Sequence, residues 1–238
     1  MNQAESTRAA APSDETFLEE VEDVGDAGGG VRIRDRFGLV LALLLILYVL
    51  AAFEPGTYVT LVITLLWIAL LLTILWSSGL PARIRRIGLG AIALLLITSI
   101  PLGLLNTDVS AGWRFVMLGI AQLAAMLAVL SRVFRHQVVT FQTVMGGVAA
   151  YALMAFIMGS VYSAGDLFSQ GAFLNGVVND GDYTYFSFIT LTTVGYGDIT
   201  PATVVAKRLV VVEAFVGQVF IITLVARLVS LWGKPLRG

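Results

Sequence analysis

Near the C-terminal end of the chain, residues 185–201 read YFSFITLTTVGYGDITP. Two glycines, Gly195 and Gly197, alternate here with residues that carry side chains. Glycine readily adopts the positive φ values that L-residues avoid, so this alternation allows a backbone in which successive carbonyl groups point the same way. A ladder of carbonyl oxygens can replace the water around a dehydrated cation. The residue types therefore predict a carbonyl-lined path for a cation.

The composition of the whole chain is that of an integral membrane protein. Hydrophobic residues make up 58% of its 238 residues and charged residues 13%, whereas soluble domains contain roughly 45–50% apolar residues; the mean hydropathy is +0.88. The sequence has no cysteine, which excludes disulfides and Cys-ligated metal sites. No group of residues offers a nucleophile with its base, so we expect neither an enzyme nor a bound cofactor.

Six apolar segments are long enough to be membrane-spanning helices. They are residues 37–53, 57–76, 87–105, 113–130, 138–162 and 204–232. Residues 182–191 suit a short re-entrant helix, whose C-terminal end would direct partial negative charge toward the path. Irregular backbone at membrane depth is tolerated only where it is buried in protein or lines a water-filled path. We therefore expect an all-α membrane fold in which residues 193–197 line that path.

Basic residues gather in alternate connections between the predicted spans. They are Arg32, Arg34, Arg36, Arg83, Arg85, Arg86, Arg132, Arg135, Lys234 and Arg237. The positive-inside rule then predicts that both termini are cytoplasmic, and we expect the plasma membrane. We predict an acidic, disordered cytoplasmic tail at residues 1–36, where large apolar residues are few. A four-helix membrane domain at residues 37–136 and a pore domain at residues 137–238 are expected to follow.

Residues 192–198, TTVGYGD, resemble the signature sequence of potassium channels. The resemblance covers about residues 138–232, and the first four spans match that family by count only. It implies that K+ is coordinated by main-chain carbonyls and by one threonine hydroxyl. The implied ligands are Thr193, with both its carbonyl and its hydroxyl, and Val194, Gly195 and Tyr196. The resemblance places Gly197 and Asp198 at the outer mouth, where the Asp198 carboxylate would brace the filter from behind.

Several neighbouring residues are expected to support this filter. Thr192 precedes it directly, and Tyr185 and Phe186 hold the positions of an aromatic collar that is often built from tryptophans in the family. Ile189 stands where some members carry a glutamate that hydrogen-bonds behind the filter. Glu213 is an acid inside the last predicted span, and an ionisable residue there indicates a functional site. It would either brace the re-entrant helix or tune the attraction of cations.

The last predicted span also carries the expected gate. Gly217 corresponds to the hinge glycine of the inner helices of potassium channels, and close helix packing is the alternative explanation for it. Gln218, Ile221 and Val225 share a helical spacing with Ala214 and are expected to line the path. Ile221 and Val225 would form a constriction that closes by dewetting. Packing between helices is again the alternative.

The chain holds one filter segment, whereas such a filter needs four around one axis, so we expect a homotetramer in contact with membrane lipids. We expect no nucleic acid or soluble partner. The predicted function is passive, K+-selective conduction. A voltage sensor needs repeated arginines, but residues 115–131 carry no charge, so strong voltage gating is not expected. A voltage-gated channel, a weakly selective cation channel and a subunit of a K+ uptake transporter remain the alternatives.

Overall fold

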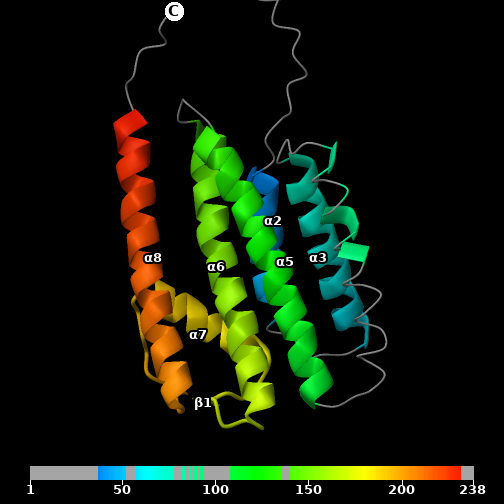
Figure 1. The fold of residues 1–238 in the computed structure, drawn as a ribbon, viewed down its shortest axis with the longest axis vertical. Helices are drawn as coiled ribbons and strands as arrows, with labels where there is room; N and C mark the ends of the chain where they lie inside the picture. The colour runs from blue at the N-terminus through cyan, green and yellow to red at the C-terminus, as the bar shows by residue number, and fades with distance from the viewer. Residues whose placement is uncertain are drawn as a thin grey trace, which may run out of the picture. The chain divides into compact units, whose positions relative to one another are not determined.

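The computed structural model describes residues 37–51, 57–77, 82–83, 86, 88–90, 92–93, 108–135 and 140–231. The long helices in these ranges are α2 (Phe37–Leu50), α3 (Thr57–Ser77), α5 (Asp108–Arg135), α6 (Phe141–Phe168), α7 (Gly181–Leu191) and α8 (Val204–Leu231). Two short strands, β1 (Leu174–Asn175) and β2 (Thr200–Pro201), pair in antiparallel register. In Figure 1, α7 runs obliquely across α6 and α8, near the end where α6 finishes and α8 begins.

Most of the helices lie where the sequence predicts them. The short re-entrant helix is α7, and the last predicted span is α8. The bounds of the fifth predicted span, 138–162, are wrong because α6 runs from Phe141 to Phe168. Thr140 and Thr143 form a reciprocal capping box that fixes its start. The helix continues past the apolar segment because Asp166 in its last turn finds hydrogen-bond partners.

Two further differences concern the ends of the helices and the strands. The fourth predicted span, 113–130, is longer in the structure, since α5 takes in polar residues at both of its ends. The β1–β2 pair is a small departure from an all-α fold. The acidic segment 1–36 and nearly all of the third predicted span, 87–105, lie outside the described residues. The division between residues 136 and 137 stays a prediction.

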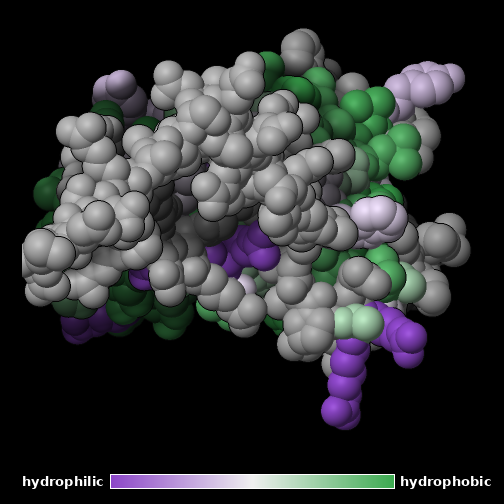
Figure 2. Space-filling model, turned by 90° about the horizontal axis from the view of Figure 1, so that it is seen from above, coloured by the Kyte–Doolittle hydropathy of each residue, from purple (hydrophilic) through white to green (hydrophobic). Residues whose placement is uncertain are grey.

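Three of the described helices, α5, α6 and α8, are long and apolar enough to cross a membrane, and α2 and part of α3 form shorter apolar helices. Hydrophobic side chains also lie on the outer surface in several places, as Figure 2 shows from the end at which α8 finishes. These helices and the hydropathy identify a membrane protein. The count of six spans stays a prediction.

Helix α6 lies at the centre of the packing and contacts α2, α5, α7 and α8. The main core includes Phe37, Leu44, Val129, Leu153 and Phe156, all of them buried. Among the described residues, α8 packs on α6, α7 and β2, and many of its large apolar side chains are exposed. Among them are Val211, Phe215, Val219, Ile222 and Val229. The protein therefore leaves a long apolar surface on α8 for lipid or for another chain.

Candidate functional site

The backbone of residues 193–197, called the filter segment below, alternates in conformation. Thr193, Gly195 and Gly197 have φ values of 59°, 53° and 81°, whereas Val194 and Tyr196 have no positive φ. Positive φ at every second residue is the alternation that the expected carbonyl ladder requires. At Thr193 it is adopted by a β-branched residue, for which this conformation is strained, and such strain is held at functional sites.

The filter segment is fixed to the C-terminal end of α7. A helix leaves its last carbonyls without partners inside the helix, and here each of the last four accepts a hydrogen bond. The Phe188 carbonyl accepts from the Thr192 amide, and the Thr190 carbonyl accepts from the Thr193 amide. The Ile189 carbonyl accepts from the amides of Val194 and Gly195. The Leu191 carbonyl accepts from the Tyr151 hydroxyl. Donor–acceptor distances are 2.6–3.1 Å. The position of α7 therefore determines the position of the filter segment.

At the C-terminal end of the filter segment, the carboxylate of Asp198 contacts Tyr185 on α7, one of the two predicted collar residues. The Tyr185 hydroxyl donates to Asp198 Oδ2 at 2.7 Å, and the Ile199 amide donates to Asp198 Oδ1 at 3.0 Å. The hydrogen bond from Tyr185 holds the pKa of the Asp198 carboxyl below its usual value. Tyr185 thus supplies a hydrogen bond that joins Asp198, directly after the filter segment, to α7; the bracing role of Asp198 stays a prediction.

The second predicted collar residue, Phe186, is buried, and its side chain has no group that can form a hydrogen bond. Its ring meets that of Tyr162 edge to face at 5.3 Å. Together with the buried Ile189 it lines a largely apolar hollow of about 340 Å³ beside Thr193 and Gly195. Ile189 acts through its main chain, since its carbonyl accepts from the filter amides. The glutamate side chain found at this position in some potassium channels therefore has no counterpart here.

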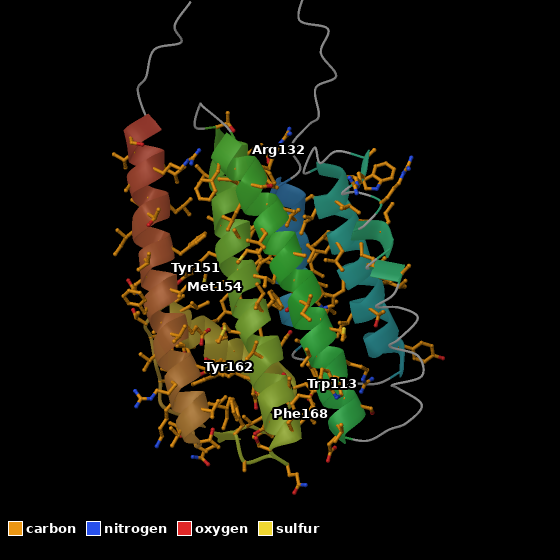
Figure 3. The ribbon with its side chains drawn as sticks, in the orientation of Figure 1. Trp113, Arg132, Tyr151, Met154, Tyr162 and Phe168 are labelled. Carbon is orange, nitrogen blue, oxygen red and sulfur yellow. The ribbon has the colours of Figure 1, made fainter. Side chains whose placement is uncertain are left out.

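Glu213 lies behind α7 and is 2% exposed. The Tyr162 hydroxyl of α6 donates to Glu213 Oε2 at 2.5 Å, and the Ser187 hydroxyl of α7 donates to Oε1. Tyr162 is fully buried on α6, and Figure 3 shows Tyr151 and Tyr162 at two levels of that helix. Of the two roles predicted for Glu213, this placement fits the brace behind the re-entrant helix.

Gly217 lies one turn further along the same face of α8. A Cβ built on it would lie 2.5 Å from Leu191 Cδ2, so α8 approaches the end of α7 closely at this point. Helix α8 also runs without a break from Val204 to Leu231, through Gly217. Close packing therefore accounts for this glycine in the observed conformation.

The predicted lining residues lie on other faces of α8. Gln218 is exposed, Val225 is 52% exposed, and Ala214 and Ile221 are half-buried. Ala214 also borders the apolar hollow beside the filter segment. The chain by itself brings none of these side chains against a partner across the path, so their lining role stays a prediction.

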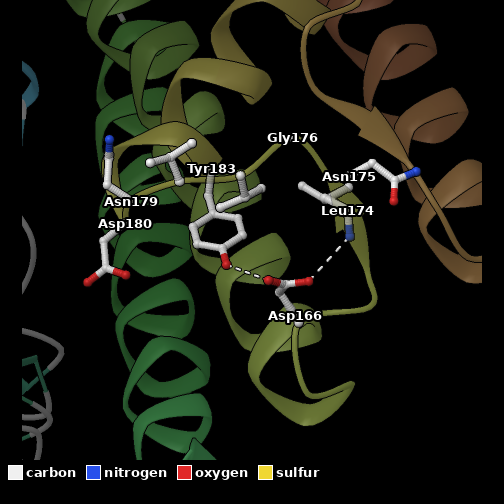
Figure 4. A pocket seen from close by; sticks show the side chains of 10 residues that line it. Asp166, Leu174, Asn175, Gly176, Asn179, Asp180 and Tyr183 are labelled. Atoms are coloured by element: carbon white, nitrogen blue, oxygen red, sulfur yellow. Dashed lines mark hydrogen bonds between the residues drawn. The ribbon is translucent and has the colours of Figure 1, made fainter.

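A second buried acid, Asp166, braces the other end of α7. The Tyr183 hydroxyl donates to Asp166 Oδ2 at 2.6 Å, and the amides of Phe173 and Leu174 donate to Oδ1 at 2.8 and 3.3 Å. Figure 4 shows Asp166 between Tyr183 and Leu174 at the edge of a polar pocket of about 440 Å³. Asp166 thus joins the end of α6, the β1 loop and the start of α7.

Sequence reasoning missed five of these bracing residues: Tyr151, Tyr162, Asp166, Tyr183 and Ser187. Their partners lie 17 to 51 residues away in the chain, apart from the local amides of Asp166. A usable signal existed only for Tyr183 and Ser187, which stand four residues apart on one face of α7. Two polar side chains with that spacing on a buried helix indicate polar partners on the neighbouring helices.

Comparison with known proteins shows similarity to ion channels in this part of the chain. Residues 148–233 match a family model described as "Ion channel", a range that includes α7, the filter segment and α8. The chain is also similar to two-pore potassium channel 4 of Arabidopsis thaliana, with 49% identity over 49 residues. That match covers 21% of this chain, and the chain spans only 17% of the length of that relative. The predicted resemblance to potassium channels is confirmed.

Proposed function

We propose that the protein conducts K+ passively and selectively across a membrane, because residues 148–233 match an ion-channel family model and part of the chain is similar to a potassium channel. The alternation of positive φ at Thr193, Gly195 and Gly197 carries this proposal. By resemblance, the carbonyls of residues 193–196 and the Thr193 hydroxyl replace the water around K+, which is the transported substrate. Asp198, Tyr185 and the end of α7 hold this backbone in place.

The conducting unit in this proposal is a homotetramer, since each chain contributes one filter segment. The exposed side chains in the single chain support it: Tyr196 is 73% exposed and Val194 is 50% exposed. Both would be covered if four filter segments met around one axis and the apolar hollow beside each were filled by the neighbouring chain. The exposed apolar faces of α8 would then meet neighbouring chains and lipid.

We further propose that the chain crosses the plasma membrane six times, that both termini are cytoplasmic and that the channel is not strongly voltage-gated. Residues 115–131 of α5 carry no charge, whereas each charge that crosses the field supplies only about 2.3 kcal/mol per 100 mV. Arg132, near the end of α5, lies where the positive-inside rule accounts for it. The first helices then act mainly in packing and assembly.

Reversal potentials test the proposal on purified full-length protein in liposomes, under opposed gradients of K+ and Na+. We expect a reversal potential close to that of K+, and equal permeability to the two ions would refute selective conduction. Gly195→Ala should lower the K+/Na+ permeability ratio, since alanine at a positive φ costs roughly 1–2 kcal/mol and this cost recurs in each chain. An unchanged ratio would refute the assignment of the path to the filter segment.

Gly38→Ala is a matched control for this experiment. A Cβ meets nothing within 4 Å at either Gly38 or Gly195, but only Gly195 has a positive φ. The pair therefore separates the effect of the backbone conformation from that of added volume. We expect the Gly38→Ala protein to keep the permeability ratio of the unmodified chain.

A further inference from the structure

Three helices meet at the buried Glu213 carboxylate, and each supplies one side chain. Tyr162 comes from α6, Ser187 from α7 and Glu213 itself from α8. Ser187 is 0% exposed and Tyr162 is 0% exposed, so water cannot replace either donor. None of the Lys or Arg residues that the structure describes forms a hydrogen bond with Glu213. Within the described part of the chain, its hydrogen-bond partners are these two neutral hydroxyls.

Each oxygen of the Glu213 carboxyl group has one hydroxyl partner at this cluster. An ionised carboxylate would accept a hydrogen bond from each of these hydroxyls. A protonated carboxyl would donate from one oxygen to a hydroxyl, which can itself accept, so both hydroxyls are partners of either form. A buried polar group is costly unless it is hydrogen-bonded, which makes both hydroxyls necessary partners of the Glu213 carboxyl group.

The cluster also sets the register between α7 and α8. Ser187 and Leu191 stand four residues apart on α7, and they contact Glu213 and Gly217, which stand four residues apart on α8. A hydrogen bond at one turn and a close approach at the next therefore fix the relative position of the two helices. Ile189, between the two contacts, accepts hydrogen bonds from the amides of the filter segment.

We propose that Glu213 is a positioning residue for conduction. It holds α7 between α6 and α8, and through the carbonyl of Ile189 it keeps the filter segment in its conducting conformation. Loss of either hydroxyl donor shifts the equilibrium between conducting and non-conducting conformations of the filter. This inference rests on the proposed function and adds to it a link from the last helix to the filter.

Single-channel recording of the full-length protein tests the proposal through the fraction of time that the channel is open. Tyr162→Phe removes one hydroxyl and leaves the ring, and we expect the open fraction to fall about tenfold, because one oxygen of the buried carboxyl group is left without its partner. In a Glu213→Gln background, Tyr162→Phe should have a much smaller effect, since the residues act as a unit. Simple addition of the two effects would overturn the proposal.

Ser187→Thr and Ser187→Val provide a matched pair that adds the same volume and differs only in the hydroxyl. We expect the threonine protein to open like the unmodified one and the valine protein to lose open time as Tyr162→Phe does. Equal behaviour of the pair would show that only packing matters at this position and would overturn the proposal. If the Tyr162→Phe protein fails to assemble, the comparison of Ser187→Thr with Ser187→Val still tests whether a hydroxyl partner of Glu213 is needed for opening.

Two outcomes separate this inference from the proposed function. A non-selective unmodified channel would refute the proposed function at the filter. A selective unmodified channel whose open fraction is unchanged by Tyr162→Phe and by Ser187→Val would refute only the role of Glu213. Tyr58→Phe serves as a further control, because the Tyr58 side chain is 85% exposed and lies outside the cluster.

Discussion

Gly159 of α6 lies directly against the backbone of Thr184 on α7, and its replacement by alanine tests how α7 is held. A Cβ at this position would lie 2.9 Å from Thr184 Cα, 3.2 Å from Thr184 N and 2.7 Å from Thr184 Oγ1. Because two of these atoms belong to the backbone, a side-chain rotation cannot relieve the contact. The helices must instead separate by several tenths of an ångström.

The expected size of the effect follows from two opposing contributions. Alanine favours a helix interior over glycine by about 1 kcal/mol, whereas overpacking costs about 1–3 kcal/mol. We place the clash at the upper end of that range because the backbone of Thr184 is involved. Gly159→Ala should therefore lower the free energy of unfolding by about 2 kcal/mol, measured by denaturant titration of the purified protein in micelles with circular dichroism.

Gly119→Ala on α5 is the matched control. Both glycines are buried within helices, but a Cβ at Gly119 would lie 3.5 Å from Ser160 Cβ, which is an ordinary contact. We expect this variant to be as stable as the unmodified protein or more stable by up to about 1 kcal/mol. Equal stability of the Gly159 and Gly119 variants would refute the close approach of α6 to α7.

Two further predictions concern the bracing tyrosines of α7. Asp198 is ionised at neutral pH, and because its pKa is lowered, the stabilisation from its bond with Tyr185 is lost only as the pH falls through that lowered value. Tyr185→Phe should shift the loss of single-channel conductance under outer acid to a higher pH, and identical titrations would contradict this. Tyr183→Phe removes a donor to the buried Asp166 and should lower the free energy of unfolding by about 1.5–3 kcal/mol; unchanged denaturant midpoints would contradict it.

The filter segment was predictable from the sequence because its requirement is local. A carbonyl ladder needs residues that tolerate positive φ at alternate positions, and Gly195 and Gly197 meet that need within three residues of each other. Thr193 shares the same conformation although it is not a glycine. Its positive φ could not be inferred from its residue type, since the strain is held by hydrogen bonds to the end of α7.

The supports of the filter were only partly predictable because they depend on tertiary contacts. Glu213 is predicted as a functional residue because it is an acid inside an apolar segment. Its partners, Tyr162 and Ser187, lie on two other helices and carry no signal of this contact in the sequence. Tyr151 carries no local signal, and its role follows only from the position of the Leu191 carbonyl. The end of α6 was misplaced for a similar reason, since Asp166 is satisfied by residues that follow the helix.

The braces around α7 share one chemical feature that suits a cation path. Asp166, Glu213 and Asp198 are bonded by hydroxyls and main-chain amides, and no Lys or Arg within the described ranges forms a hydrogen bond with any of them. A basic partner would give comparable rigidity, but it would place a positive charge beside the path, where repulsion of K+ is weakly screened at low dielectric constant. Neutral donors hold α7 without adding that charge. The aromatic collar with Tyr185 and the cluster at Glu213 therefore combine rigidity with an electrostatic environment that favours cations.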